Sequence, residues 1–377
     1  MVSSTSRKVG ALIIGGGIIG LAIGYYLAKK NYCNVEIVER ESELTIHASG
    51  HNAGGLASPH LNKPRELWPL FMESRRLYDE LVDAAGFEFD FVRGGTIIPG
   101  TAQEALQFEE TAHLYENVKD GIQVEFLNAK ELQEKEPNLS RERFRCALYY
   151  PLDAQGNSKK LASCFSKVCV EKGVTVTTGS EVSGFEISNG RVLEVKTQGS
   201  TIIPDTVIVA AGPWSGEISR TLGLNLPMSP VKGHLISIEA GDQRLVNSFI
   251  SGPDYYVMQN GSSIVVGGGE DSVGFDSNVN PKRVSDAWQE GVSMVPNLEF
   301  FKEKGVAAAC LRPYAEGGAP ILGKSDRLAN VIFATGHFRN GFGLAPATGE
   351  LISQLILEDR SDLDLTAFSP DRFPRNY

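Results

Sequence analysis

The alternation of apolar and polar residues at the start of the chain predicts a strand, a helix and a second strand. Residues 11–14 form a short apolar run that glycine follows, and residues 18–30 carry helix-forming side chains with a polar end. Residues 35–38 are rich in β-branched side chains and are followed by Glu39. A strand, a helix and a strand in this order form one βαβ unit, which is typical of a parallel sheet.

Further along the chain, segments with helical spacing alternate with segments that have the two-residue period of strands. Helices are expected over residues 65–85, 103–120 and 158–172, and from about residue 347. Strands are expected within residues 174–187, 206–211, 231–269 and 331–334. Parallel units at both ends and antiparallel patterning between them predict an α/β fold with an α+β insert. A discontinuous, Rossmann-like nucleotide-binding domain would carry a second domain built on a mainly antiparallel sheet.

Length and charge narrow the classes of function. The 377 residues are enough for one large or two ordinary domains, and 42% of them are hydrophobic, which allows a substantial core. The net charge of −10 argues against a nucleic-acid partner, because a groove for nucleic acid is expected to be basic. Val9 to Ala28 is uncharged, but glycines interrupt it repeatedly, so we expect no integral membrane segment.

The five cysteines are odd in number and include no CxxC pair. A disulfide framework or a zinc site is therefore not expected, and no other metal site is indicated. Reduced thiols are typical of a cytoplasmic protein. The sequence is compatible with a homo-oligomer and does not set the number of copies.

The segment Gly15-Gly16-Gly17-Ile18-Ile19-Gly20 places a G-x-G-x-x-G motif between the first strand and the helix. Gly15 allows a tight turn, Gly17 lets the backbone approach a pyrophosphate, and Gly20 lets the helix pack closely on the strand. Glu39 follows about 20 residues later, at the end of the next strand, where a carboxylate can bind ribose hydroxyls. This context predicts a dinucleotide site rather than a plain glycine-rich turn, but it does not distinguish NAD from FAD.

A second glycine-rich segment, residues 334–349, ends a predicted strand and leads into a helix. The N-terminus of such a helix could face the electron-rich end of a flavin and stabilise its reduced, anionic form. An ordinary turn between a strand and a helix would explain the same glycines.

Together these motifs resemble the D-amino-acid oxidase superfamily, in the branch with glycine oxidase and sarcosine oxidase. The resemblance covers nearly the whole chain and is carried by residues 210–215, 231–233, 311–313, 320–323, 336–341 and 344–349. It implies FAD as the cofactor. The substrate-binding domain would comprise residues 88–136 and 229–311, and the FAD-binding domain residues 1–87, 137–228 and 312–377.

The motif and the resemblance together indicate which residues contact FAD. The resemblance implies that Val182 holds the adenine through its backbone and that Trp214 lies along the cofactor. The expected cofactor contacts are Gly15, Gly17, Ile18, Ile19, Gly20, Glu39, Arg40, Ala48, Ser49, Asn52, Ala53, Gly54, Gly55, Leu56, Val182, Ala211, Gly212, Trp214, Gly336, Arg339, Asn340, Gly341, Phe342, Gly343 and Leu344.

The resemblance also implies the substrate contacts. Arg312 would bind the substrate carboxylate with two parallel N–H donors, helped by Tyr256 and Arg339. Arg312 could instead be a surface ion-pair partner, and Tyr256 could be a core aromatic residue. Cys310 lies where sarcosine oxidases attach FAD covalently, but we interpret it as a buried strand residue and expect non-covalent FAD.

The expected reaction is oxidation of the C–N bond of a small amino acid or N-alkyl amino acid to an imine. Oxygen would be the acceptor and hydrogen peroxide the product. No catalytic base is assigned, because this chemistry at a flavin needs alignment and a neutral amine rather than a strong base. Asp153, Glu270 and Asp271 show no paired spacing for acid–base work and are interpreted as turn or surface residues.

Two alternatives stay open. The loop from His47 to Gly54 resembles the L-2-hydroxyglutarate dehydrogenase branch more than it resembles glycine oxidases, which favours a 2-hydroxy-acid dehydrogenase that reduces a quinone or carrier. That reaction needs a base, for which His51 or His60 could serve, although both of them and His337 are interpreted mainly as structural. The third interpretation is a flavoprotein subunit or a nucleotide-binding scaffold without turnover of its own.

Overall fold

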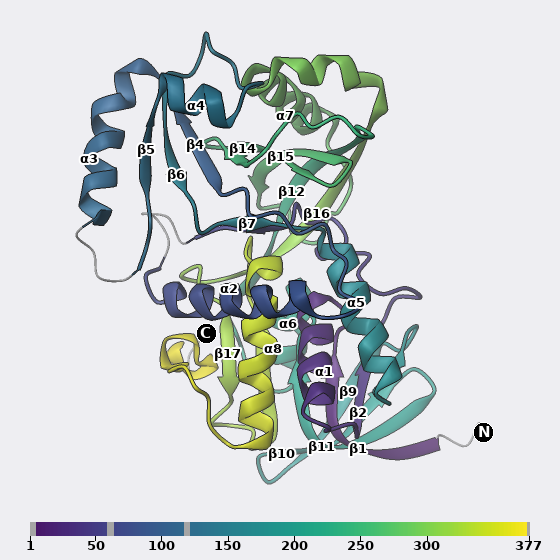
Figure 1. The fold of residues 1–377 in the computed structure, drawn as a ribbon. Coiled ribbons are helices and arrows are strands. Elements are labelled where there is room, and N and C mark those ends of the chain that lie inside the picture. Colours follow the sequence, from purple (N-terminus) through teal and green to yellow (C-terminus); the bar gives the residue numbers. More distant parts are fainter. Residues whose placement is uncertain (1–4, 59–63, 117–120, 375–377) are drawn as a thin grey trace.

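The computed structural model describes residues 5–58, 64–116 and 121–374 and contains two large sheets, one above the other in Figure 1. Helices cover the lower, mainly parallel sheet, and the upper sheet is mainly antiparallel. The mixed α/β fold with a discontinuous Rossmann-like domain is therefore confirmed.

The lower sheet has the strand order β17-β18-β11-β1-β2-β8, and β10 and β9 extend it from β11. Strands β18, β11, β1, β2 and β8 are parallel, whereas β17 is antiparallel to β18. The bounds are β1 (Thr5–Ile14), β2 (Val35–Val38), β8 (Thr175–Thr177), β9 (Val182–Ser188), β10 (Arg191–Thr197), β11 (Ser200–Val209), β17 (Ile321–Lys324) and β18 (Val331–Thr335).

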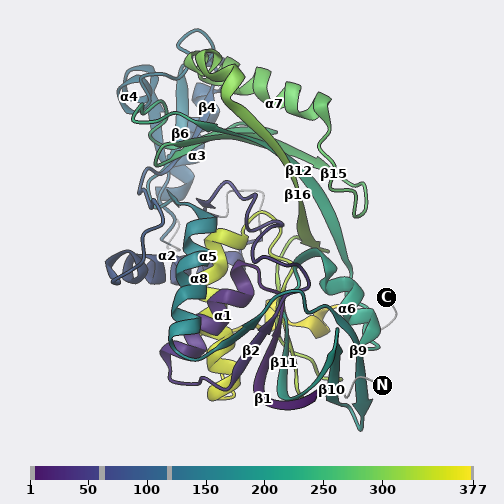
Figure 2. The same cartoon turned by 90° about the vertical axis from the view of Figure 1, so that its right-hand side faces the viewer.

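Strand β1 is buried on both faces, which explains its uninterrupted apolar run. Ala11 and Ile13 pack into a core shared with a layer of helices, whereas Leu12 and Ile14 pack into a core shared with β9 and β10. Figure 2 shows these helices on one side of the sheet. They are α1 (Ile18–Lys29), α2 (Leu67–Asp83), α5 (Ser158–Glu171) and α8 (Gly341–Leu357), and the other side carries η2 (Gly212–Trp214) and α6 (Ser215–Thr221).

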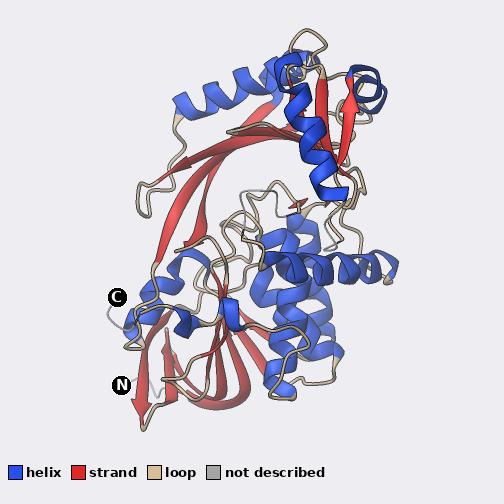
Figure 3. Cartoon of the chain, turned by 90° about the vertical axis from the view of Figure 1, so that its left-hand side faces the viewer, coloured by secondary structure: helices blue, strands red, loops and turns tan. Residues whose placement is uncertain are grey.

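The upper sheet has the order β16-β12-β15-β14-β13-β4-β6-β5 and is antiparallel except between β13 and β4. Figure 3 shows that it curves over the lower domain. The bounds are β4 (Thr96–Gly100), β5 (Glu125–Asn128), β6 (Cys146–Tyr150), β12 (Met228–Glu239), β13 (Phe249–Ser251), β14 (Tyr255–Asn260), β15 (Ser263–Asp271) and β16 (Gly305–Ala315). Its helices are α3 (Ala105–Glu116), α4 (Ala129–Lys135) and α7 (Pro281–Met294).

The remaining elements are short. They are β3 (Gly55–Leu56), β7 (Ala154–Gln155), η1 (Ala102–Glu104), η3 (Pro296–Lys304), η4 (Thr366–Phe368) and η5 (Pro370–Arg372). Strands β3 and β7 pair with each other between the two large sheets. Within the described ranges, none of the helices has the length and apolar character that crossing a bilayer requires.

Several bounds expected from the sequence need correction. Strand β6 falls in the segment assigned to the FAD-binding domain, but it pairs with β4 and β5 in the upper sheet, so the bound expected at residue 137 lies too early. Strand β16 runs across the bound expected at residue 312. Helix α3 ends at Glu116, and residues 117–120 of the predicted helix lie outside the described residues.

Asp153 is not at the surface: it is buried and accepts the N–H of Ser58 at 2.9 Å.

The last helix begins at Gly341 rather than near residue 347, because the structure accommodates a proline inside it. Pro346 has no N–H to donate to the carbonyl of Phe342, four residues earlier. The hydroxyl of Tyr78 on α2 donates to that carbonyl at 2.6 Å, and Tyr78 is fully buried. A side chain distant in the sequence therefore replaces the missing helical hydrogen bond.

We expect Tyr78→Phe to lower the free energy of unfolding by about 1–3 kcal/mol, because a buried carbonyl loses its donor. Chemical denaturation measures this change. Pro346→Ala in the same variant should recover part of the loss by restoring an N–H. The control is Tyr32→Phe, since the half-buried Tyr32 hydroxyl makes no hydrogen bond within the described residues. Equal effects of Tyr78→Phe and Tyr32→Phe would contradict this account.

Candidate functional site

The first glycine-rich turn joins β1 to α1 and combines two different uses of glycine. Gly15 has a φ of +116°, and a Cβ there would lie 2.5 Å from the carbonyl oxygen of Ala210. A Cβ on Gly20 would lie 2.0 Å from the carbonyl oxygen of Gly15. A Cβ on Gly17, in contrast, would meet only the Ser49 hydroxyl, at 3.3 Å. The fold itself requires glycine at positions 15 and 20, whereas Gly17 keeps space open in front of the helix.

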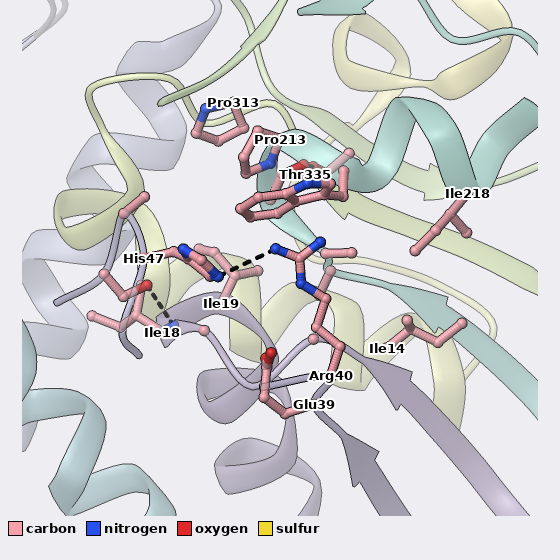
Figure 4. Close-up of a pocket in the computed structure, with 18 of the residues that line it drawn as sticks. Ile14, Ile18, Ile19, Glu39, Arg40, His47, Pro213, Ile218, Pro313 and Thr335 are labelled. Atoms are coloured by element: carbon pink, nitrogen blue, oxygen red, sulfur yellow. Dashed lines mark hydrogen bonds between the residues drawn. The ribbon is translucent and has the colours of Figure 1, made fainter. Parts of the chain in front are cut away.

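Two side chains hold this turn. Glu39, at the end of β2, accepts the N–H of Gly16 at 2.8 Å through Oε2 and the N–H of Glu41 at 3.0 Å through Oε1. The Ser49 hydroxyl accepts the N–H of Ile18 at 3.0 Å. The loop that contains Ser49 is thereby attached to the N-terminus of α1 (Figure 4).

A cavity of about 270 Å³ extends from this turn along the carboxyl ends of the parallel strands (Figure 4). The predicted cofactor contacts that line it are Gly15, Gly17, Ile18, Ile19, Glu39, Arg40, Ala48, Ser49, Asn52, Val182, Ala211, Gly212, Trp214, Gly341 and Phe342. Other lining residues are not among the predicted contacts, including His47, Ser180, Phe185, Ile218, Pro313 and Thr335. These residues come from several elements that only the tertiary fold brings together.

The other predicted cofactor contacts do not line this cavity. They are Gly20, Ala53, Gly54, Gly55, Leu56, Gly336, Arg339, Asn340, Gly343 and Leu344. Several have clear packing roles: a Cβ on Gly54 would lie 1.6 Å from the carbonyl oxygen of Gly156, and one on Gly343 would lie 3.2 Å from that of Gly55. Leu56 is buried in the core that the helices share.

One wall of the cavity is a cluster of charged and aromatic side chains. The guanidinium of Arg40 lies 3.8 Å from the ring centroid of Trp214, and the His47 ring lies 4.6 Å from it. The carboxylate of Glu41 bonds to Nε2 of His47 at 2.8 Å and accepts from Arg40 at 2.9 Å, and these bonds, that of His47 first, lower the pKa of Glu41. Phe275, on the loop after β15, stacks on Trp214 with centroids 5.8 Å apart. A loop of the upper sheet therefore packs against this wall through Phe275.

The second glycine-rich segment forms another end of the cavity. Gly336 follows β18 with a φ of +76°, and α8 begins at Gly341 with no acidic residue in its first turn. Nε2 of His337 lies 2.9 Å from the hydroxyl of Thr348, and burial lowers the pKa of His337 to about 3. His337 is therefore neutral at neutral pH and adds no charge to the positive end of the α8 dipole.

Arg312 on β16 and Tyr256 on β14 lie on the upper sheet with β12 and β15 between their strands, and neither side chain lines the cavity. A Cβ on Gly233 would lie 2.0 Å from Nη2 of Arg312, and one on Gly267 would lie 2.5 Å from the Tyr256 hydroxyl. The two glycines thus leave room for both side chains to lie across the sheet. Nη1 of Arg312 donates to the carbonyl of Gly269 at 2.7 Å. Burial raises the pKa of Tyr256 and the charge of Arg312 lowers it, which fits their proximity.

The third predicted substrate residue, Arg339, has a partner that the sequence did not indicate. Its Nη1 lies 3.3 Å from Oε1 of Glu270, and both side chains are about half exposed. Cys310 is buried, and burial raises the pKa of its thiol. His51 does not line the cavity, and its Nδ1 lies 3.2 Å from the carbonyl of His47. Among the described residues, no cluster of histidine, cysteine and acidic side chains could hold a metal ion.

Known proteins are similar to this chain in sequence and in fold. Residues 11–355 match the family described as "FAD dependent oxidoreductase" (DAO). Glycine oxidase of Geobacillus kaustophilus (strain HTA426) is 31% identical over 97% of this chain and 98% of its own, and that of Bacillus subtilis (strain 168) is 30% identical over the same shares. The crystal structure of glycine oxidase from Geobacillus kaustophilus aligns with a TM-score of 0.89 at 28% identity, over 98% of this chain and 100% of that chain. This chain belongs to the DAO family of FAD-dependent oxidoreductases.

Proposed function

We propose that this enzyme oxidises the C–N bond of a small amino acid or N-alkyl amino acid to an imine. Oxygen is the proposed acceptor and hydrogen peroxide the product. The observation that carries the proposal is Arg312, whose guanidinium makes no ion pair within the described ranges although it is half buried. The glycine oxidase relatives, about 30% identical over nearly the full chain, support the same chemistry.

Arg312 is suited to hold a substrate carboxylate. One of its donors is used by the carbonyl of Gly269, and this bond fixes the plane of the guanidinium. A half-buried cation without an anionic partner favours binding of an anion, and a guanidinium can offer parallel donors to one carboxylate. The hydroxyl of Tyr256 lies close to the same group and adds a second, neutral donor.

The cavity has the features that FAD requires. Gly17 leaves open space at the N-terminus of α1, which suits a pyrophosphate, and the carboxylate of Glu39 lies at the strand end where ribose hydroxyls are expected. The N-terminus of α8 suits the flavin end, because it lacks acidic residues that would cancel its dipole. FAD, when bound, supplies the two-electron oxidation, and the chain's residues bind and orient the substrate.

The described residues give the 2-hydroxy-acid alternative little support, because that reaction needs a base that can take up a proton from the substrate. Nδ1 of His51 lies 3.2 Å from the carbonyl of His47, and His60 lies outside the described residues. His337 lines the cavity, but a pKa of about 3 is too low for a group that must take up a proton near neutral pH. Oxidation of a neutral amine requires no such group.

Gly17→Val should abolish FAD binding without unfolding the protein, because the new side chain fills space that the fold leaves open. Flavin absorbance after purification measures binding, and circular dichroism measures folding. Gly20→Ala is the contrasting variant: its Cβ would overlap the carbonyl of Gly15, so it should destabilise the fold itself. A Gly17→Val protein that keeps a full complement of FAD would refute this placement.

FAD should be bound without a covalent link, because burial keeps the Cys310 thiol protonated and a thiol is a far weaker nucleophile than a thiolate. Acid precipitation should leave the yellow colour in the supernatant. Native Cys310→Ser protein should also contain FAD, and acid precipitation should release it in the same way. Flavin that stays in the washed pellet of the parent protein, but not of Cys310→Ser, would show the opposite.

Glycine, sarcosine or a small D-amino acid should reduce the flavin without oxygen, and oxygen should restore it with release of peroxide.

Arg312→Ala should cost about 2–5 kcal/mol of transition-state binding. Arg312→Lys keeps the charge but loses the planar fork, so KM should rise and kcat should fall together. Both variants should keep their FAD. Reduction by 2-hydroxyglutarate and by no amino acid, or unchanged turnover in Arg312→Ala, would contradict the proposal.

A further inference from the structure

Two arginines are held close together by the backbone. Arg312 precedes Pro313, whose carbonyl accepts the N–H of Phe338 at 2.8 Å. Phe338 in turn precedes Arg339 and has a φ of +50°, a region that residues other than glycine seldom adopt. One hydrogen bond therefore ties the residue after the first arginine to the residue before the second.

Two consecutive residues of strand β15 contact the two arginines. Gly269 accepts a hydrogen bond from Arg312 at 2.7 Å, and the next residue, Glu270, pairs with Arg339 at 3.3 Å. Both arginines also lower the pKa of the buried Tyr256, against the larger effect of burial, so both lie near the same hydroxyl. Glu270 thus pairs with Arg339 and directly follows the residue whose carbonyl holds Arg312.

A β-bulge turns Glu270 towards this face. His234 on β12 is paired with Gly268, whereas Lys232 is paired with Asp271, so Gly269 and Glu270 together oppose one residue of β12. The extra residue reverses the alternation of the strand. Asp271 consequently bonds to Arg283 of α7 on the outer face, and Glu270 is left on the inner face with Arg312.

The two arginines therefore differ in charge environment. The guanidinium of Arg312 makes no ion pair in the described part of the chain, whereas a carboxylate of the chain already occupies Arg339. Of the two guanidinium groups, only that of Arg312 is then available to a substrate carboxylate. A second substrate carboxylate would have to displace Glu270 or lie beside it, and like charges at close range repel each other.

We infer that Glu270 determines specificity for monocarboxylates, by occupying Arg339 so that only Arg312 is available to a substrate carboxylate. The inference rests on the proposed function, since it takes Arg312 as the carboxylate site. It narrows the substrate to amino acids with one carboxylate and excludes those, such as N-carboxymethyl amino acids, that carry two. Glu270 acts as a positioning residue and takes no part in the oxidation.

The test compares binding of acetate and malonate to the FAD-loaded protein by calorimetry and by the change in flavin absorbance. Neither ligand can be oxidised here, so binding is measured without turnover. In the parent protein acetate should bind more tightly than malonate. In Glu270→Gln malonate should bind about 2- to 5-fold more tightly than in the parent, the scale expected for a half-exposed ion pair, while acetate changes less than about 1.5-fold. The matched control is Glu299→Gln, which removes a similarly exposed ion-paired carboxylate near Lys302.

The double variant Glu270→Gln with Arg339→Gln should lose the gain for malonate, because the gain depends on releasing Arg339. If the parent binds acetate and Glu270→Gln binds malonate no better, the inference is wrong and the proposed carboxylate site stands. The same holds if the parent already prefers malonate. If the parent binds neither ligand, the proposed site fails and the inference fails with it.

Discussion

The close approach of α1 to β1 is the constraint on which the cofactor cavity depends. Gly20 packs against the carbonyl of Gly15, at a distance that excludes any side chain, so the helix starts directly at the strand end. The N-terminus of the helix therefore lies beside the space that Gly17 leaves open. The same strand end receives Glu39 from β2, so a positive helix end and a carboxylate face one cavity. An anionic pyrophosphate and a hydroxyl-bearing ribose are the groups that match this pair.

The upper sheet solves a different problem, which is to place polar groups on a face that is otherwise apolar. Leu235, Met258 and Val265 form part of a small core on the sheet, together with the ring of Tyr256. Gly233 and Gly267 leave room for the side chains of Arg312 and Tyr256 to lie across the neighbouring strands. Orientation is thus determined by missing side chains as much as by those present, and a substrate would meet a polar patch within an apolar surround.

The sequence predicts what depends on neighbouring residues and misses what depends on distant ones. The βαβ unit and the glycine motif could be predicted because strand, turn and helix are encoded within 35 consecutive positions. The start of α8 could not, since Pro346 is a helix breaker unless a donor such as Tyr78 lies beside it. Strand β6 has an apolar sequence that suits either sheet. Likewise, the pairing of Glu270 with Arg339 depends on a bulge, which no local pattern reveals.

The order of strands in the lower sheet has a consequence for how the chain folds as it is synthesised. Strand β1 pairs with β2, which follows it closely in the sequence. Its other partner, β11, is synthesised much later, and β18 and α8 follow near the end of the chain. Until then, the surface of α1 that α8 covers has no partner, and contacts of such large sequence separation form slowly. The upper sheet faces a similar delay, because β16 comes after its other strands. A nascent chain of this protein thus carries exposed apolar surface through most of its synthesis, which makes it a natural client for chaperones that shield such surfaces.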